Sequence, residues 1–172
     1  MPSCRPKSTG SADKRQMRKV ITAALALTAA SSLHAQTSAV TPTVDYSTAT
    51  PVEGSWSYVT MPGGSEATFA NTAAQQQLTI TCSRPTRQVT ISKPATGAAA
   101  FISVWTTGQT RNLPSSYNPA TGKLSATLAA FDPLLDAIAF SRGRVEVGVA
   151  GQAALVVPSW AEAARVIEDC RV

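Results

Sequence analysis

Acidic residues in the second half of the chain are the first candidates for chemistry. Asp132 and Asp136 are four positions apart, which puts both carboxylates on one face of a helix, and Glu146 lies on the strand expected next. Paired carboxylates of this kind can cleave glycosidic bonds by acid–base catalysis. A structural role explains the first two better, because Asp132 can cap the helix and Asp136 in the first turn favours the helix dipole. We expect the structural role and keep a small carboxylate-based hydrolase as the alternative function.

Nucleophilic catalysis has little support in the composition. The only histidine, His34, lies in a segment that we expect to be removed, which excludes Ser-His-Asp and Cys-His machinery and histidine-bound metals. Lys93 and Lys123 leave a Ser-Lys pair open, but each lies beside turn residues, where a solvated lysine is expected. No phosphate-binding or dinucleotide-binding glycine motif occurs. We therefore expect no enzyme activity, no catalytic residue, no cofactor and no metal site.

Two arginines separated by one glycine, Arg142 and Arg144, are the candidate binding residues. Such a pair could hold a carboxylate or phosphate with fork geometry. The favoured alternative is that Arg142 complements the negative end of the preceding helix while Arg144 lies on a solvated strand face. The aromatic residues Trp56, Trp105 and Tyr117 form either a recognition surface or part of the core, and core is the commoner case.

Residues 17–35 have the pattern of a secretory signal peptide. Two basic residues precede an apolar run from Val20 to Ala30, and small residues follow, so cleavage is expected between Ala35 and Gln36. The run of 11 residues is shorter than the roughly 20 that a membrane-spanning helix needs. We therefore expect a periplasmic or secreted protein with no stable membrane insertion after cleavage.

Removal of this leader changes the charge balance. The whole chain has a formal net charge of +5, but six of its 15 basic residues and only Asp13 of its 10 acidic residues precede position 36. The mature chain is close to neutral, so the basic pI gives no argument for nucleic acid or anionic membranes. Residues 1–16 precede an internal methionine, Met17, and are either an extension or the result of a start placed too far upstream at Met1.

Cysteine usage also depends on the leader. Cys4 is lost with it, which leaves Cys82 and Cys170 as an even pair in an exported chain. An oxidising compartment makes a disulfide the expected outcome, and two cysteines without histidine are too few ligands for zinc.

The remaining sequence predicts one α+β domain over residues 56–172, after a flexible lead-in at 36–55 that should make almost no contacts with it. About six to eight short strands should form a mainly antiparallel sheet with two short helices, preceded by the signal-peptide helix. Period-two alternation places strands at 56–60, 66–70, 78–82, 89–91, 101–107, 124–128, 145–149 and 153–157. Residues 112–122 carry two prolines and are expected to form a loop.

Both helices have start signals. Asp132 and Pro133 suit the cap and the first position of one helix, and Ser159 with Glu162 forms a capping-box pattern for the other. In the second helix one face should hold Trp160, Ala163, Ala164, Ile167 and Cys170. That face points Cys170 inward, and Cys82 continues the inward face of its strand, so we predict a bond between them.

The stretches "LTITC", "FDPLLDAIAFSRGRVEV" and "PSWAEAARVIEDCR" resemble small uncharacterised secreted proteins of alphaproteobacteria. A more distant resemblance is to the VasI-like family associated with type VI secretion, which also places one cysteine in an early strand and one near the end. The resemblance implies an envelope location and a single disulfide, and it transfers no active site. We expect a non-enzymatic binding or assembly-support domain with an envelope protein or peptide partner, of open oligomeric state.

Overall fold

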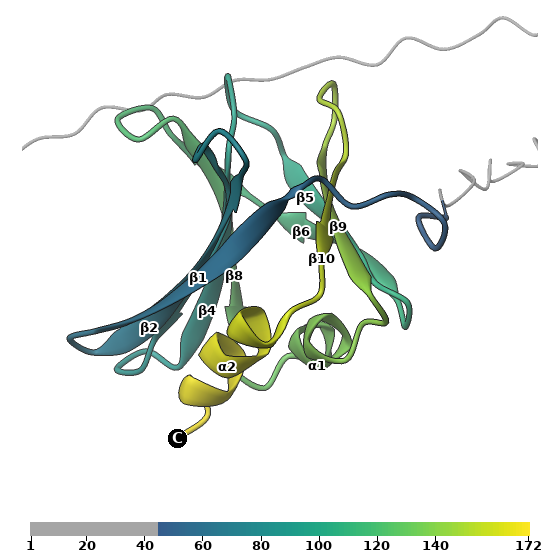
Figure 1. The fold of residues 1–172 in the computed structure, drawn as a ribbon. Coiled ribbons are helices and arrows are strands. Elements are labelled where there is room, and N and C mark those ends of the chain that lie inside the picture. Colours follow the sequence, from purple (N-terminus) through teal and green to yellow (C-terminus); the bar gives the residue numbers. More distant parts are fainter. Residues whose placement is uncertain (1–44) are drawn as a thin grey trace, which may run out of the picture. The chain divides into compact units, whose positions relative to one another are not determined.

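Alternating apolar and hydroxyl-bearing side chains build two antiparallel sheets that enclose one core (Figure 1). The computed structural model describes residues 45–172. In sheet order, six strands form the first sheet: β1 (Gly54–Met61), β2 (Gly64–Asn71), β3 (Gln76–Ser83), β4 (Gln88–Pro94), β8 (Lys123–Ala129) and β7 (Ser116–Asn118). Four form the second: β10 (Leu155–Pro158), β9 (Arg144–Val149), β5 (Phe101–Trp105) and β6 (Thr110–Pro114). The helices α1 (Pro133–Ala139) and α2 (Ala161–Asp169) close the lower end.

The α+β architecture and the predicted strands are confirmed, but the described residues contain ten strands rather than six to eight. The two additional strands are β6, whose last three residues fall in the segment 112–122 that was predicted to be a loop, and β7, which lies wholly within that segment. That prediction is wrong because both are edge strands, where a proline costs no ladder hydrogen bond. Pro114 ends β6, and Pro119 lies in the turn between β7 and β8.

The lead-in is also more ordered than predicted. The expectation of few contacts is wrong for residues 45–55, since the ring of Tyr46 packs edge-on against Trp105 with centroids 6.0 Å apart. The Ala49 carbonyl accepts a hydrogen bond from Arg144, and the Val52 amide donates to the Val156 carbonyl at 2.8 Å. This segment therefore runs along the outer face of the four-stranded sheet. The predicted signal peptide and its cleavage site lie outside the described residues.

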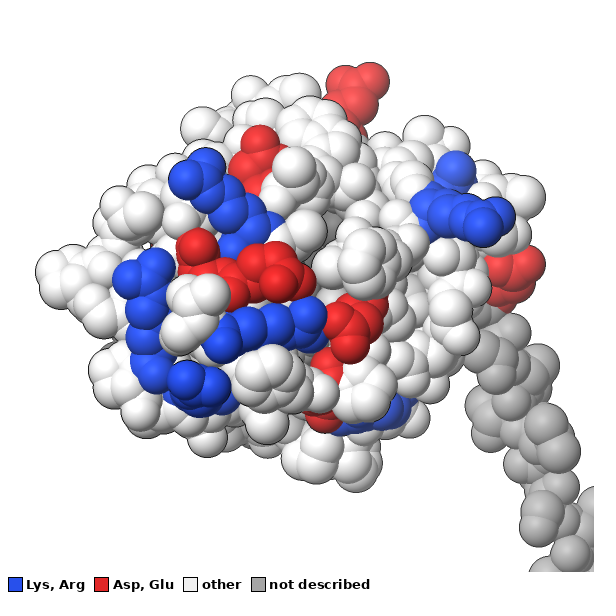
Figure 2. Space-filling model, turned by 90° about the horizontal axis from the view of Figure 1, so that it is seen from below, with Lys and Arg blue, Asp and Glu red and all other residues white. Residues whose placement is uncertain are grey.

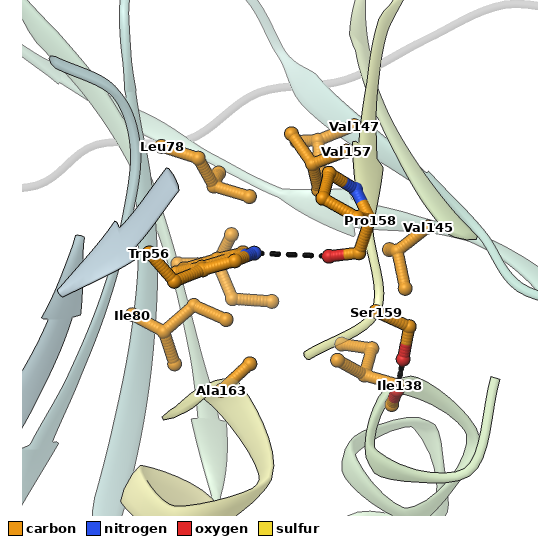
Figure 3. Close-up of a pocket in the computed structure, with 11 residues that line it drawn as sticks. Trp56, Leu78, Ile80, Ile138, Val145, Val147, Val157, Pro158, Ser159 and Ala163 are labelled. Atoms are coloured by element: carbon orange, nitrogen blue, oxygen red, sulfur yellow. Dashed lines mark hydrogen bonds between the residues drawn. The ribbon is translucent and has the colours of Figure 1, made fainter. Parts of the chain in front are cut away.

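The core lies between the two sheets and the helices. Trp56 from β1 crosses this space, and its indole donates to the Pro158 carbonyl at 2.9 Å (Figure 3). The gap beside it measures only about 10 Å³, room for roughly one water molecule, so it belongs to the core and is too small for a ligand. Trp56 is part of this core and Tyr117 packs against it, whereas Trp105 is buried on the outer face of the four-stranded sheet beneath Tyr46.

Helix α1 starts as predicted. Pro133 occupies its first turn, and the Asp132 side chain accepts a hydrogen bond from the Leu134 amide at 2.9 Å. The capping box predicted for α2 is wrong, because Trp160 is the N-cap and the Ser159 hydroxyl instead donates to the Ile138 carbonyl of α1 at 3.4 Å.

Helix α2 covers the lower inner face of β1, β2 and β3. Its buried residues are Ala163, Val166 and Ile167, and Cys170 at its C-cap is buried too, while Trp160 is 46% exposed and so lies off the face that was predicted to include it. The predicted disulfide is confirmed: Cys82 and Cys170 are bonded, with Cα atoms 5.4 Å apart, across 88 positions of sequence.

Candidate functional site

Two of the three acids considered for catalysis bind arginines. Asp132 accepts two hydrogen bonds from the Arg111 guanidinium, at 2.6 and 2.8 Å, and Asp136 accepts one from Arg171 at 2.7 Å. The bonds from Arg111 hold the pKa of Asp132 below its usual value, which keeps it ionised rather than ready to donate a proton. The geometry supports the structural role for this pair of carboxylates.

Substitutions at Asp132 should separate its two contacts. We expect Asp132→Ala to cost about 1–2 kcal/mol of unfolding free energy, because it removes the helix cap as well as the arginine partner. Asp132→Asn keeps a capping oxygen and should cost less than about 1 kcal/mol, since the pair with Arg111 is partly exposed. Urea unfolding of both variants measures the difference, and equal losses would contradict the capping role.

The third acid, Glu146, is buried in the middle of β9. It lies between Trp105 of β5 and Val156 of β10 on the outer face of the four-stranded sheet. Gly148 makes room for it, because a Cβ at that glycine would lie 2.4 Å from Glu146 Oε1. Burial raises the pKa of Glu146 to about 7, and the Lys93 amine only partly opposes this. The structure thus keeps Glu146 away from the acids of α1.

The prediction for Lys93 is wrong. It was predicted to be solvated beside a turn, but it is only 5% exposed, because it occupies the inward face of β4 together with Val89 and Ile91. Burial lowers the pKa of Lys93, and the Glu146 carboxylate partly opposes the shift. Lys123 behaves more nearly as predicted: it is partly exposed and donates to Gln76 at 3.0 Å.

The candidate binding arginines are not brought together as a clamp. Arg144 directs its guanidinium at the Ala49 carbonyl of the lead-in, so its strand face is covered rather than solvated. Arg142 is exposed, and its backbone amide donates to the Thr107 hydroxyl at 3.1 Å. Of these two arginines, Arg144 therefore has a structural partner for its guanidinium, and Arg142 is exposed at the surface.

A different feature, which local sequence patterns do not show, is the free edge of β1. Four strands form sheet edges, and three of them have features that discourage pairing with a further strand. β7 has three residues, β6 ends at Pro114, and β10 has four residues of which Val156 already pairs with Val52. β1 has eight residues, GSWSYVTM, with no charge and no proline to discourage pairing.

The register of the β1–β2 hairpin shows which groups lie on this edge. A two-residue turn joins Met61 to Gly64, and these two residues pair directly. Hydrogen-bonded and non-bonded pairs alternate along antiparallel strands, so the backbone groups of Trp56, Tyr58 and Thr60 point away from β2. No backbone partner for them is found within residues 45–172. The edge thus presents a row of free donors and acceptors.

Helix α2 makes this edge one wall of a groove. A pocket of about 340 Å³ lies between Tyr58 on β1 and Ala161, Glu162 and Arg165 on α2. The Arg165 guanidinium lies 4.1 Å from the centre of the Tyr58 ring, and the Tyr58 hydroxyl donates to Asp169 at 2.6 Å. These contacts hold the helix beside the edge, so the groove is largely preformed.

The charge on Asp169 strengthens this attachment. Burial alone would raise the pKa of Asp169, but the hydrogen bond from Tyr58, together with the nearby Arg84 and Arg165 guanidinium groups, keeps it below its usual value. The Arg84 side chain also donates to the Asp169 backbone carbonyl at 3.2 Å. The groove wall is therefore fixed by ionic as well as apolar contacts.

Seen from the helical end, basic and acidic side chains lie interspersed (Figure 2). Neither sign gathers into a broad patch on this face, so nothing there favours a polyanion such as nucleic acid. Within residues 45–172, no cluster of three or more His, Cys, Asp or Glu side chains is suited to a metal. Neither α1 nor α2 is long and apolar enough to cross a bilayer.

Comparison with known proteins gives no further guide. No protein family, curated protein or solved structure matches the chain.

Proposed function

We propose that this chain is an exported binding domain of the bacterial envelope that takes up an extended segment of a protein partner on the free edge of β1. The observation that carries the proposal is the long, uncharged edge beside a preformed groove. An extended peptide can add to such an edge as a further strand, with main-chain hydrogen bonds giving affinity and neighbouring pockets giving specificity.

The groove also indicates what the partner segment looks like. Ser57 and Val59 flank the edge on the outer face, and the Tyr58 ring with Ala161 lines the inner side. A segment rich in β-branched residues, with an aliphatic side chain directed at Tyr58 and Ala161, fits these neighbours. Glu162 and Arg165 carry opposite charges, so a neutral side chain suits the position better than a charged one.

Export and the absence of catalysis are part of the same proposal. The Cys82–Cys170 disulfide agrees with an oxidising compartment, as does the resemblance to secreted and VasI-like proteins. The hydrolase alternative has less support, because Asp132 and Asp136 at α1 bind arginines while Glu146 is buried on the outer face of the four-stranded sheet.

Substitution of Thr60 tests the edge directly. Thr60→Pro removes a backbone donor that the fold does not use, and proline is tolerated on edge strands. Thr60→Ala is the matched control, since it removes the hydroxyl and keeps the donor. Peptides selected from a random 12-residue display library against the mature protein should bind Thr60→Pro at least about tenfold more weakly than Thr60→Ala, with melting temperatures alike.

Hydrogen exchange locates the bound segment. The amides of Trp56, Tyr58 and Thr60 should become protected when a selected peptide binds. Selected peptides that bind both variants equally, or that protect another surface instead, would show the edge is not the binding site.

A further inference from the structure

Lys93 lines a second pocket, at the end of the sheets away from the helices. The pocket has a volume of about 350 Å³ and is lined by residues from the end of β4, the start of β3 and the turn that joins β9 to β10. This volume is within the range of small-molecule sites. Its wall combines the polar residues Gln77 and Gln152 with the aliphatic residues Ala154 and Leu155.

A β-bulge contributes Gln77 to this wall. Phe69 of β2 pairs with Leu78, but the next residue, Ala70, pairs with Gln76, which leaves Gln77 without a partner in the ladder. Bulges re-aim side chains in this way and recur beside binding sites. Gln77 thereby lines the same pocket as Lys93, and its carboxamide nitrogen donates one hydrogen bond to the Gln75 carbonyl at 3.5 Å, which leaves its second hydrogen available.

The Lys93 amine has few partners for a buried charge. An ammonium group has three donors, yet within residues 45–172 the one acceptor found for it is the Val147 carbonyl, at 3.5 Å. No carboxylate of these residues lies within ion-pair distance of the Lys93 amine. Glu146 is the charged group that influences the Lys93 pKa, but its side chain projects from the opposite face of β9. A buried amine that makes one long hydrogen bond is costly, and an oxygen acceptor in the pocket would relieve that cost.

We propose that this pocket binds a small carboxylate-bearing molecule, with Lys93 as its cationic anchor and the Gln77 and Gln152 carboxamides as further donors. A single amine matches a single negative charge. A phosphate would call for additional cations, and the wall holds no arginine. The aliphatic remainder of the molecule would contact Ala154 and Leu155. This site is separate from the β1 edge, so the two proposals stand or fall independently.

A titration with matched probes tests the site. Propionate and its neutral analogue propionamide are added to the mature protein carrying isotope-labelled lysine, and the signals of Lys93 and Lys123 are followed by NMR. Propionate should shift the Lys93 signal saturably while leaving Lys123 unchanged, and propionamide should bind at least about tenfold more weakly. Affinity for propionate should fall as the pH rises, because the buried amine loses its proton earlier than an exposed lysine.

Two variants distinguish the role of Lys93 from the effect of removing any lysine charge. Lys93→Met should abolish propionate binding, and Lys123→Met, the control, should retain it. Equal binding of propionate and propionamide would overturn the proposal, as would no saturation by about 50 mM propionate, far above the range of a specific site. Because the probe comparison uses the unsubstituted protein, it decides the matter even where Lys93→Met fails to fold.

Discussion

Reduction of the Cys82–Cys170 bond should lower the unfolding free energy by about 4–5 kcal/mol, the amount that chain entropy assigns to a loop of this length. Such a loss is comparable to the whole stability of many small domains and corresponds to a drop in melting temperature of roughly 10–20 °C. The effect should be large because the bond joins the last helix to β3, across most of the domain.

The first part to open after reduction should be helix α2. Its remaining attachments include the buried side chains Val166 and Ile167, the Tyr58–Asp169 hydrogen bond and the Arg171–Asp136 ion pair. Amide exchange in α2 should therefore accelerate before exchange in β3 and β4. This would also widen the groove beside β1, so reduced protein should bind the selected peptides more weakly.

Thermal unfolding with and without reductant measures the effect. The double variant Cys82→Ala/Cys170→Ala is the control: it should resemble reduced protein and should not respond to reductant. Equal melting temperatures of oxidised and reduced protein would contradict the proposed contribution of the bond.

The sequence predicted those features that depend on neighbouring residues. Alternation placed Leu78, Ile80 and Cys82 on one face of a strand, and the Asp132–Pro133 pair marked the start of α1. The inward positions of both cysteines follow from the same local periods, so their pairing could be predicted. Local periodicity is reliable here because one face of each element is buried.

The features that were missed depend on contacts between distant segments. The alternation of Glu146 with valines predicts a strand, but it does not show that the lead-in containing Tyr46 covers this face of the sheet. Ser159 matches a capping box in the local sequence, but its hydroxyl donates to the Ile138 carbonyl of α1 instead. The free edge of β1 is visible only from the strand order, which no local pattern contains.

The pH dependence of stability should reveal the buried Glu146 carboxyl. Its pKa is about 7 in the folded chain and 4.5 is the ordinary value, so between these values the folded state binds a proton that the unfolded state releases. The stabilisation by this proton is complete below about pH 4.5 and is lost as the pH rises through 7. The loss should approach about 3 kcal/mol, since each pKa unit corresponds to about 1.4 kcal/mol.

This pH window separates Glu146 from the other perturbed groups. Asp132 and Asp169 have lowered pKa values, so their contributions are lost only as the pH falls below the ordinary aspartate range. The pKa of Tyr46 is raised from a value that is already alkaline, so Tyr46 does not titrate between pH 5 and 7.5. Lys93 acts in the opposite direction, because a lowered lysine pKa makes stability rise with pH above its folded value. A decline between pH 5 and 7.5 therefore points to Glu146.

Urea unfolding at pH 5 and pH 7.5 should show this decline in the wild-type domain. Glu146→Gln keeps the size of the side chain and removes its charge, so it should flatten the profile and leave the domain more stable than wild type at pH 7.5. Glu53→Gln, at an exposed position before β1, is the matched control and should keep the wild-type profile. A decline that persists unchanged in Glu146→Gln would mean that another group carries the pH dependence, and that β9 tolerates the ionised carboxylate without cost.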